Sequence, residues 1–346
     1  MFTMEDILKL QQKIVPEMLK LLEKRYNILR TIYYKQPIGR RVLANDLEIG
    51  ERIVRTEINF LKNQSLIDIN SSGMTVTKEG EEIIDRLKSF IHEVKGLKEI
   101  ESILKNKLEI FEVIIVPGNL DEDITVKNEL GKAAANYLKN IVQDKDIIAL
   151  TGGSTVKEVV DNMPKINTLK DAVVVPARGG IGRDVELQAN TLVANLASKI
   201  NANYKLMHVQ DNLSEAALKA VMEEKSIKEV LDMIHKVNIL IHGIGIAEVM
   251  ATRRGIPSEE IAYIEEKKAV AEAFGYYFDM KGNIVHSSPT IGIKRESIRN
   301  ANKLIAVSGG KKKAKAILAA EVRNKNSVLI TDEGAAREII NILENE

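Results

Sequence analysis

The chain has no cysteine and no tryptophan among its 346 residues, and aromatic residues make up only 4% of it. Without cysteine it can have no disulfide, no thiolate metal site and no thiol nucleophile, which fits the cytoplasmic location we expect. The scarcity of aromatic side chains disfavours stacking surfaces for sugars or single-stranded nucleic acid. The 5 histidines show no metal-binding spacing such as HExxH, so we expect neither a bound metal nor a cofactor.

Long hydrophobic runs are missing as well. No apolar stretch approaches the roughly 20 residues that a transmembrane helix needs. The N-terminal MFTMEDILKL lacks the basic start and the continuous apolar core of a signal peptide, and we expect no membrane contact. The formal net charge is only +1, so any binding of nucleic acid must depend on a local basic surface. The length is sufficient for two domains.

The N-terminal part, residues 1–77, has the pattern of a winged helix-turn-helix domain. Residues 5–35 predict two helices interrupted by Pro16. Residues 40–47 and 51–64 predict two further helices on either side of a turn, and LIDINSSGMTVT predicts two short strands. Helix, turn, helix and small hairpin is the element order of that DNA-binding domain.

The helix at 51–64 has two distinct faces. Val54, Ile58 and Leu61 recur at i, i+4 and i+7 and predict a buried face. Polar residues occupy another face, and an arginine pair, Arg40–Arg41, lies earlier in the chain at the start of the first helix of the motif. Such a charged face is most often only a solvated surface, but the arginine pair and the hairpin favour contact with DNA. We predict that the DNA-binding residues are Arg40, Arg41, Arg52, Arg55, Thr56 and Asn59.

Residues 78–107 predict a helical linker. Its apolar residues from Ile83 to Leu104 keep a heptad spacing, except that Glu101 occupies one place of the seam. The seam could pack within one chain or form an interface between two chains. We favour a dimerisation arm, because winged-helix regulators usually bind two-fold symmetric sites as dimers.

From residue 108 to residue 346, apolar strands alternate with amphipathic helices. This alternation predicts an α/β domain with a Rossmann-like, doubly wound, mostly parallel sheet covered by helices on both faces. We expect strands at 111–116, 146–151, 171–177, 205–209, 237–242, 303–307 and 327–331, and a small hairpin at 276–286. We expect helices at 127–143, 154–163, 187–202, 214–235, 311–324 and 334–345.

A glycine-rich loop at residues 152–155, Gly-Gly-Ser-Thr, follows one predicted strand and precedes a helix. Ligands of open α/β sheets bind at such strand ends. Glycines let the backbone come close, and the N–H groups of the helix N-terminus and the two hydroxyls can donate to a phosphate. The spacing is not that of a Walker A loop. An ordinary N-cap would explain either hydroxyl equally well.

Three further strand ends carry candidates for anion binding. Arg178 follows a strand in PARGGIGRD and could hold an anion with two hydrogen bonds. SGGKKKAKAI places Lys313 in the first turn of a predicted helix, where a cation is unfavourable unless an anion is bound. HGIGIAEVMATRRG offers Arg253 and Arg254, and its Gly-x-Gly matches a dinucleotide fingerprint only weakly.

Glu272, in AVAEAFGYYF, lies among apolar residues and could act as a general base or accept hydrogen bonds from sugar hydroxyls. No second group is apparent that would complete an acid–base pair. His242 ends a strand, and a histidine in this position is more often structural than catalytic. We therefore predict no catalytic residue.

Together these segments resemble the SorC/DeoR-type sugar-responsive transcriptional regulators over essentially the whole chain. The resemblance is carried by RRVLANDLEIGERIVRTEINFLKNQSLI, TGGST, VVPARGGIGRDVELQANTLVANLA, EAFGYYFD and SGGKKKAKAI. It implies a sheet domain like that of sugar-phosphate isomerases and deaminases, retained as a sensor of a phosphorylated sugar. The first expectation for that effector is fructose-1,6-bisphosphate.

By the same resemblance, the glycine-rich loop would hold one phosphate, and Lys313 would reach the same or the neighbouring anion. Arg178 and Arg253 would serve the other phosphate, and Gln188 and Glu272 would contact sugar hydroxyls. The implied effector residues are Gly152, Gly153, Ser154, Thr155, Arg178, Gln188, Arg253, Glu272 and Lys313.

The resemblance also implies a repressor of glycolytic genes. It would bind double-stranded operator DNA as a homodimer or homotetramer and release it when the effector binds. The alternative is a sugar-phosphate isomerase or deaminase on the same fold. That alternative leaves residues 36–77 unexplained, so we expect a regulator rather than an enzyme.

Overall fold

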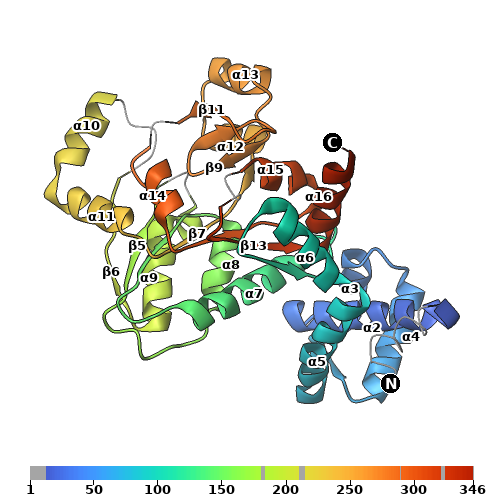
Figure 1. Cartoon of the computed structure of the whole chain (residues 1–346). Coiled ribbons are helices and arrows are strands. Elements are labelled where there is room, and N and C mark those ends of the chain that lie inside the picture. The colour runs from blue at the N-terminus through green and yellow to red at the C-terminus, as the bar shows by residue number, and fades with distance from the viewer. Residues whose placement is uncertain (1–12, 181–183, 210–214, 289, 321–323, 346) are drawn as a thin grey trace, which may run out of the picture. The chain divides into compact units, whose positions relative to one another are not determined.

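The structure, a computed structural model, describes residues 13–180, 184–209, 215–288, 290–320 and 324–345 (Figure 1). Its contacts divide the chain into two units. Unit 1 comprises residues 1–99 and 122–125, and unit 2 comprises residues 100–121 and 126–346. The helix predicted before Pro16 lies largely outside the described residues.

Unit 1 contains the winged helix-turn-helix that the sequence predicts. The helix at Arg40–Asp46, the turn, the helix at Glu51–Asn63 and the antiparallel hairpin follow in the expected order. Its elements are α2 (Pro16–Lys35), α3 (Arg40–Asp46), α4 (Glu51–Asn63), β1 (Ile67–Asn70), β2 (Gly73–Val76) and α5 (Lys78–Val94).

The core of unit 1 confirms the predicted buried face of α4. Val54, Ile58 and Leu61 are buried together with Leu43 of α3 and Ile84 of α5. Each fully buried aliphatic side chain stabilises the fold by roughly 1.5–3 kcal/mol. The opposite face of α4 therefore stays at the surface.

The predicted helical linker is not one continuous helix. α5 ends at Val94, Gly96 takes a positive φ of 62°, and α6 (Leu97–Leu108) begins anew. A single heptad seam from Ile83 to Leu104 is therefore wrong. Within α6, Glu101 accepts a hydrogen bond from the N–H of Ile115 at 2.7 Å, which explains why a charged residue interrupts the apolar spacing.

Unit 2 is built on a sheet of seven strands within the described chain, and every neighbouring pair is parallel. The strand order is β3-β13-β12-β7-β4-β5-β6. The chain proceeds toward one edge from β4 and toward the other from β7, so the topological switch point lies between these two strands. The strands are β3 (Glu112–Val116), β4 (Ile147–Leu150), β5 (Val173–Pro176), β6 (Asn203–Tyr204), β7 (Ile239–His242), β12 (Lys303–Val307) and β13 (Ser327–Asp332).

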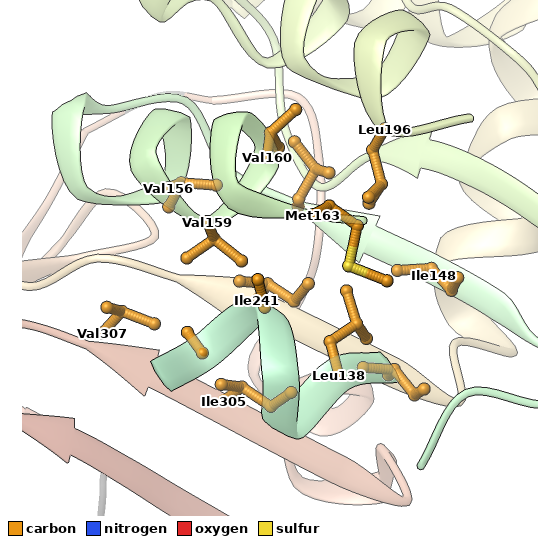
Figure 2. Close-up of a cluster of buried hydrophobic side chains, with 14 of the residues drawn as sticks. Leu138, Ile148, Val156, Val159, Val160, Met163, Leu196, Ile241, Ile305 and Val307 are labelled. Carbon is orange, nitrogen blue, oxygen red and sulfur yellow. The ribbon is translucent and has the colours of Figure 1, made fainter. Parts of the chain in front are cut away.

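Helices cover both faces of this sheet, as the doubly wound pattern predicts (Figure 1). On one face, Val156 and Val159 of α8 pack toward Ile241 and Ile305 of the central strands (Figure 2). Leu240 alternates with Ile241 along β7 and therefore faces the other side. The helices on the first face are α7 (Val126–Ile141), α8 (Ser154–Asn162) and α9 (Ala189–Ile200); α11 (Lys225–His235) and α16 (Glu333–Asn345) contact the sheet outside this cluster.

A second sheet, of four antiparallel strands, is only partly anticipated by the sequence. Its order is β11-β10-β9-β8. The hairpin of β10 (Tyr276–Phe278) and β11 (Ile284–Ser287) matches the predicted one at 276–286. β8 (Gly245–Ile246) and β9 (Ala271–Ala273) are too short for an alternating pattern to show. The Gly-x-Gly after β7 therefore leads into a strand and not into a dinucleotide-binding loop.

The remaining helices of unit 2 are α10 (Glu215–Glu223), α12 (Ala247–Arg253), α13 (Ser258–Glu266), α14 (Arg295–Asn300) and α15 (Ala314–Ala319), with short 3-10 turns at Val185–Leu187 and Lys311–Lys313. Of these helices, α12 and α15 contact the second sheet. No helix of the described chain combines the length and the apolar character needed to cross a bilayer.

Three predicted elements differ from the structure. Residues 205–209 form no strand, because the N–H of Met207 donates to the side chain of Asn190 instead of to a neighbouring strand. The helix expected at 214–235 is interrupted at Glu224, which has an extended backbone. The helix expected at 311–324 is shorter, since α15 ends before Ala320; residues 321–323 lie outside the described chain.

Candidate ligand pocket and nucleic-acid interface

A pocket in unit 2 lies at the C-terminal ends of β4 and β7, beside the switch point of the sheet. It encloses about 610 Å³, including the space open to solvent at its mouth. Loops after four parallel strands and the β9–β10 hairpin contribute to it. Its lining residues are Thr151, Gly152, Gly153, Ser154, Thr155, Arg178, Gly243, Ile244, Gly245, Met250, Arg253, Arg254, Glu272, Phe274 and Lys313.

The N-terminus of α8 forms the backbone part of this pocket. Gly153 precedes the helix with a φ of 125°, a conformation that favours glycine. At Gly152, a Cβ would lie 2.5 Å from the carbonyl oxygen of Leu187. The first N–H groups of a helix have no intrahelical acceptor, and in α8 no side-chain cap takes its place. Together with the hydroxyls of Ser154 and Thr155, they form the kind of site that binds anions.

Three charged side chains lie buried in the pocket wall. Arg178, Arg254 and Glu272 are 4%, 6% and 4% exposed. Oε1 of Glu272 accepts from Nη2 of Arg254 at 2.6 Å, from Nη1 of Arg178 at 3.4 Å and from the N–H of Gly275 at 2.7 Å. Two guanidinium groups thus share one carboxylate, and the surplus positive charge favours an anionic ligand.

The same contacts define the chemistry of Glu272. Its Oε1 accepts from two guanidinium groups and one backbone N–H, so the side chain acts here as an acceptor of hydrogen bonds. No hydrogen bond to its other oxygen, Oε2, is found within the described residues. That oxygen can therefore accept a hydroxyl of a ligand.

The adjacent arginines at the end of α12 differ in position. Arg254 is buried against Glu272, whereas Arg253 is exposed and lines the pocket from its mouth. Arg253 also lines an adjoining pocket, which contains Gln188 at the N-terminus of α9. The two pockets also share the lining residues Gly152, Gly153 and Met250.

Lys313 is a half-buried cation of the pocket, less enclosed than Arg178 and Arg254. Its Nζ donates to the carbonyl oxygen of Ile244 at 3.0 Å. Burial lowers the pKa of its ammonium group, and the charges of Asp121 and Asp332 only partly offset this effect. An anion in the pocket would favour the charged form and raise the pKa again.

The second Gly-Gly loop, at residues 309–310, does not offer its backbone to an anion. The N–H of Gly310 donates to Asp332 at 2.8 Å, and the N–H of Lys312 donates to Asp121 at 2.8 Å. The N–H of Lys311 donates to Asn119 at 3.2 Å. Internal acceptors therefore occupy the places that the sequence suggested for a phosphate, and this loop contributes only Lys313 to the pocket.

His242 lies at the end of β7, behind the pocket lining. Burial lowers its pKa to about 4, which the hydrogen bond to the backbone of Gly243 only partly opposes. The ring is therefore neutral, and Nδ1 donates to the carbonyl oxygen of Gly243 at 3.1 Å. This matches the structural role that the sequence indicated.

The structure places the predicted ligand-binding residues, which come from distant segments of the chain, around two adjoining pockets. Eight of the nine line the main pocket, and Gln188 lines the adjoining one. The sequence analysis missed Met250 and Phe274, because an apolar side chain gives no sign in the sequence that it lines a ligand pocket. The lining residues outside the predicted effector set are Thr151, Gly243, Ile244, Gly245, Met250, Arg254 and Phe274, of which Arg254 was named beside Arg253 as a candidate for anion binding.

The predicted DNA-binding residues of unit 1 are all exposed. On α4, Arg52, Arg55, Thr56 and Asn59 lie on the face opposite the buried core residues. Exposed Arg41, from α3, lies 3.7 Å from Glu51 at the start of α4. Basic and polar side chains at the N-terminal half of the second helix are what a recognition helix presents to the major groove.

The acidic residue in the middle of α4 is turned away from this surface. Glu57 is buried and accepts from Lys24 and Arg25 of α2, each at 2.8 Å. Burial raises its pKa, but the hydrogen bonds and charges of these two cations outweigh that effect, and the net pKa is lowered. The negative charge of Glu57 is therefore compensated within the fold and does not oppose a nucleic acid.

Both parts of the chain match known protein families. The family model of the CggR N-terminal DNA binding domain matches residues 21–91, and a sugar-binding domain model matches residues 92–341. The central glycolytic genes regulator of Priestia megaterium is 44% identical over 97% of this chain and 99% of its own length. The protein of the same name from Bacillus subtilis is 42% identical over 97% of this chain and 99% of its own length.

A solved SorC family transcriptional regulator from Enterococcus faecalis superposes on 70% of this chain and 99% of its own, with a TM-score of 0.66 and 38% identity. The relatives are transcriptional regulators with a DNA-binding domain and not enzymes. The isomerase or deaminase alternative is thereby set aside. A winged helix with a basic α4 face and a pocket lined by cations in a sugar-binding domain agree with these matches, and the chain belongs to the SorC/DeoR-type family of sugar-responsive transcriptional regulators.

Proposed function

We propose that the chain represses glycolytic genes and that fructose-1,6-bisphosphate weakens its binding to operator DNA. The composition of the pocket supports this most directly. One helix N-terminus and the four cations Arg178, Arg253, Arg254 and Lys313 surround the single carboxylate of Glu272. A sugar bisphosphate carries about three to four negative charges at neutral pH, which suits this excess of positive charge better than a monophosphate does.

The two phosphates bind in different ways. The N–H groups of α8, with Ser154 and Thr155, hold one phosphate, and Lys313 reaches the same anion. Arg178 and Arg253 serve the other. Glu272 accepts hydrogen bonds from the sugar hydroxyls, and the amide of Gln188 donates to them or accepts from them. The position of Arg253 on both pockets is compatible with a ligand that extends from one into the other.

The DNA is bound by the surface of α3 and α4, in a homodimer or homotetramer that works in the cytoplasm. Arg52, Arg55, Thr56 and Asn59 contact the major groove, and Arg40 and Arg41 contact phosphates. The names of the two relatives from Priestia megaterium and Bacillus subtilis support glycolytic genes as the targets. The effector acts by favouring the state of the protein that binds DNA less tightly.

Two measurements in sequence test this function. A thermal-shift panel of phosphorylated sugars, with inorganic phosphate at equal ionic strength as control, identifies the effector, because a ligand of the folded state raises the melting temperature. A gel shift with operator DNA, with and without the best ligand, tests the coupling. The proposal fails if no sugar phosphate stabilises the chain more than inorganic phosphate, or if the stabilising ligand leaves the gel shift unchanged.

A further inference from the structure

Phe274 and Gly275 form the two-residue turn of the β9–β10 hairpin. Ala273 pairs directly with Tyr276, so no other residue belongs to the turn. Both turn residues have positive φ, 56° at Phe274 and 88° at Gly275. The first position of such a turn usually holds asparagine, aspartate or glycine. Phenylalanine is strained there, because its Cβ crowds the backbone in the left-handed region.

The turn is joined to the charged groups of the pocket. The N–H of Gly275 donates to Oε1 of Glu272 at 2.7 Å. A Cβ on Gly275 would lie 2.9 Å from Nη2 of Arg178, so the turn approaches that arginine closely. The backbone at Phe274 is thus held in place by contacts on its neighbours, and its strain is maintained by the surrounding structure.

The ring of Phe274 lies between His242 and the pocket. Its centroid is 4.4 Å from that of the neutral His242 ring, with the two planes 39° apart. The side chain is buried, yet it lines the pocket in which Arg178 and Lys313 supply positive charge. Phe274 therefore gives a polar, cationic pocket an aromatic wall, in a chain whose few aromatic residues disfavoured such a surface.

We propose that Phe274 determines specificity for the sugar part of the effector, an inference that rests on the proposed function. Its ring packs on the carbon-bound hydrogens of a sugar, which form an apolar surface, while the cations hold the phosphates. Phosphate groups without a sugar make no use of this wall. The position keeps a strained phenylalanine because the ring is needed there, a pattern found at ligand-binding sites.

The test uses Phe274→Asn in the full-length chain. Asparagine is favoured at this turn position, so the hairpin and the Gly275–Glu272 hydrogen bond are retained while the ring is removed. Calorimetric titrations compare fructose-1,6-bisphosphate with pyrophosphate, which carries two phosphates and no sugar. We expect affinity for the sugar bisphosphate to fall by about ten-fold or more, with pyrophosphate affinity unchanged within about two-fold.

Phe274→Leu is the second variant, because leucine keeps an apolar side chain without the ring. Its affinity for the sugar bisphosphate is expected between those of wild type and Phe274→Asn. This variant also carries the test if the asparagine variant does not fold. Wild-type affinity for the sugar bisphosphate in the folded variants would show that the ring only fills the core around His242 and would overturn the proposal.

A parallel loss of pyrophosphate affinity would likewise overturn it, because the ring would then act through the phosphate-binding groups. If wild type binds fructose-1,6-bisphosphate no better than pyrophosphate, the proposed function fails together with this inference. If wild type prefers fructose-1,6-bisphosphate to pyrophosphate and the variants show the same preference, this inference fails and the proposed function stands.

Discussion

Nη2 of Arg254 lies 2.6 Å from Oε1 of Glu272, and both side chains are almost completely withdrawn from solvent. The preceding residue, Arg253, is exposed at the mouth of the pocket. The two arginines of the doublet therefore have separable effects. One holds the carboxylate in position, and the other is available to a ligand that enters from solvent.

Replacing Arg254 by alanine should destabilise the chain. Glu272 would keep only the longer contact to Arg178 among its two arginines, and breaking one partner of a buried ion pair typically costs about 3 kcal/mol. Arg253→Ala is the matched control, with a melting temperature close to wild type and weaker binding of the effector. Chemical denaturation and calorimetric titration measure the two effects. Equal stability losses for both variants would contradict the separation.

Lys313→Ala should abolish most of the stabilisation by fructose-1,6-bisphosphate. Its ammonium group is buried at the pocket, and a lost charge-assisted hydrogen bond to phosphate corresponds to about ten-fold or more in affinity. Lys312, the preceding residue in the same turn, is exposed. Lys312→Ala is therefore the control and should respond like wild type. A full ligand-induced rise of the melting temperature in Lys313→Ala would remove Lys313 from the phosphate site.

Arg55→Ala should weaken binding to operator DNA by about ten-fold or more, as expected for a residue that contacts a base or a phosphate. Lys62→Ala removes the same charge from the C-terminal end of α4 and should have a smaller effect. Both variants should be stabilised by the effector as wild type is, since each unit has its own core. Fluorescence anisotropy with labelled operator measures the affinities; unchanged binding by Arg55→Ala would exclude this face from the DNA interface.

His242 should make the folded state sensitive to mild acid. Its pKa is about 4 in the folded chain and about 6.5 in the unfolded chain. Between these values the unfolded chain binds one more proton, so the contribution of His242 is fully present above pH ~6.5 and decreases as the pH falls toward 4. The expected loss is about 3 kcal/mol over this range.

The comparison variant is His242→Asn, whose amide can still donate to the carbonyl of Gly243 but does not titrate. Urea unfolding at several pH values should show a shallower dependence of the unfolding free energy for this variant between pH 4 and pH 6.5. Identical slopes for the two proteins would mean that the histidine accepts a proton in the folded state.

Local patterns in the sequence were enough for the winged helix and the parallel sheet. Periodicity shows the buried face of α4, and apolar runs show the strands, because both depend on residues close together in the chain. The same patterns could not show the break at Gly96, where one left-handed residue ends a helix that the heptad spacing continues. The two- and three-residue strands of the second sheet were equally invisible.

The pocket shows a similar division. Glycines, hydroxyls and cations at strand ends mark most of its lining, since ligand sites of open sheets collect there. Two features of the pocket could be seen only in the structure. The sequence does not distinguish Arg253 from Arg254, and only the fold shows which of the two is buried. The Gly309-Gly310 loop looked like an anion site because nothing in its own sequence shows that Asp332 and Asp121 reach its amides.

The occupied amides of the Gly309-Gly310 loop bear on how ligand choice can change in this family. Of the two glycine-rich loops, only the one before α8 offers backbone N–H groups, and no replacement other than proline removes such a donor. A second phosphate must then rely on side chains such as Arg253, which one codon change can delete or introduce. Selectivity between singly and doubly phosphorylated sugars would therefore evolve quickly, whereas recognition of the first phosphate would persist.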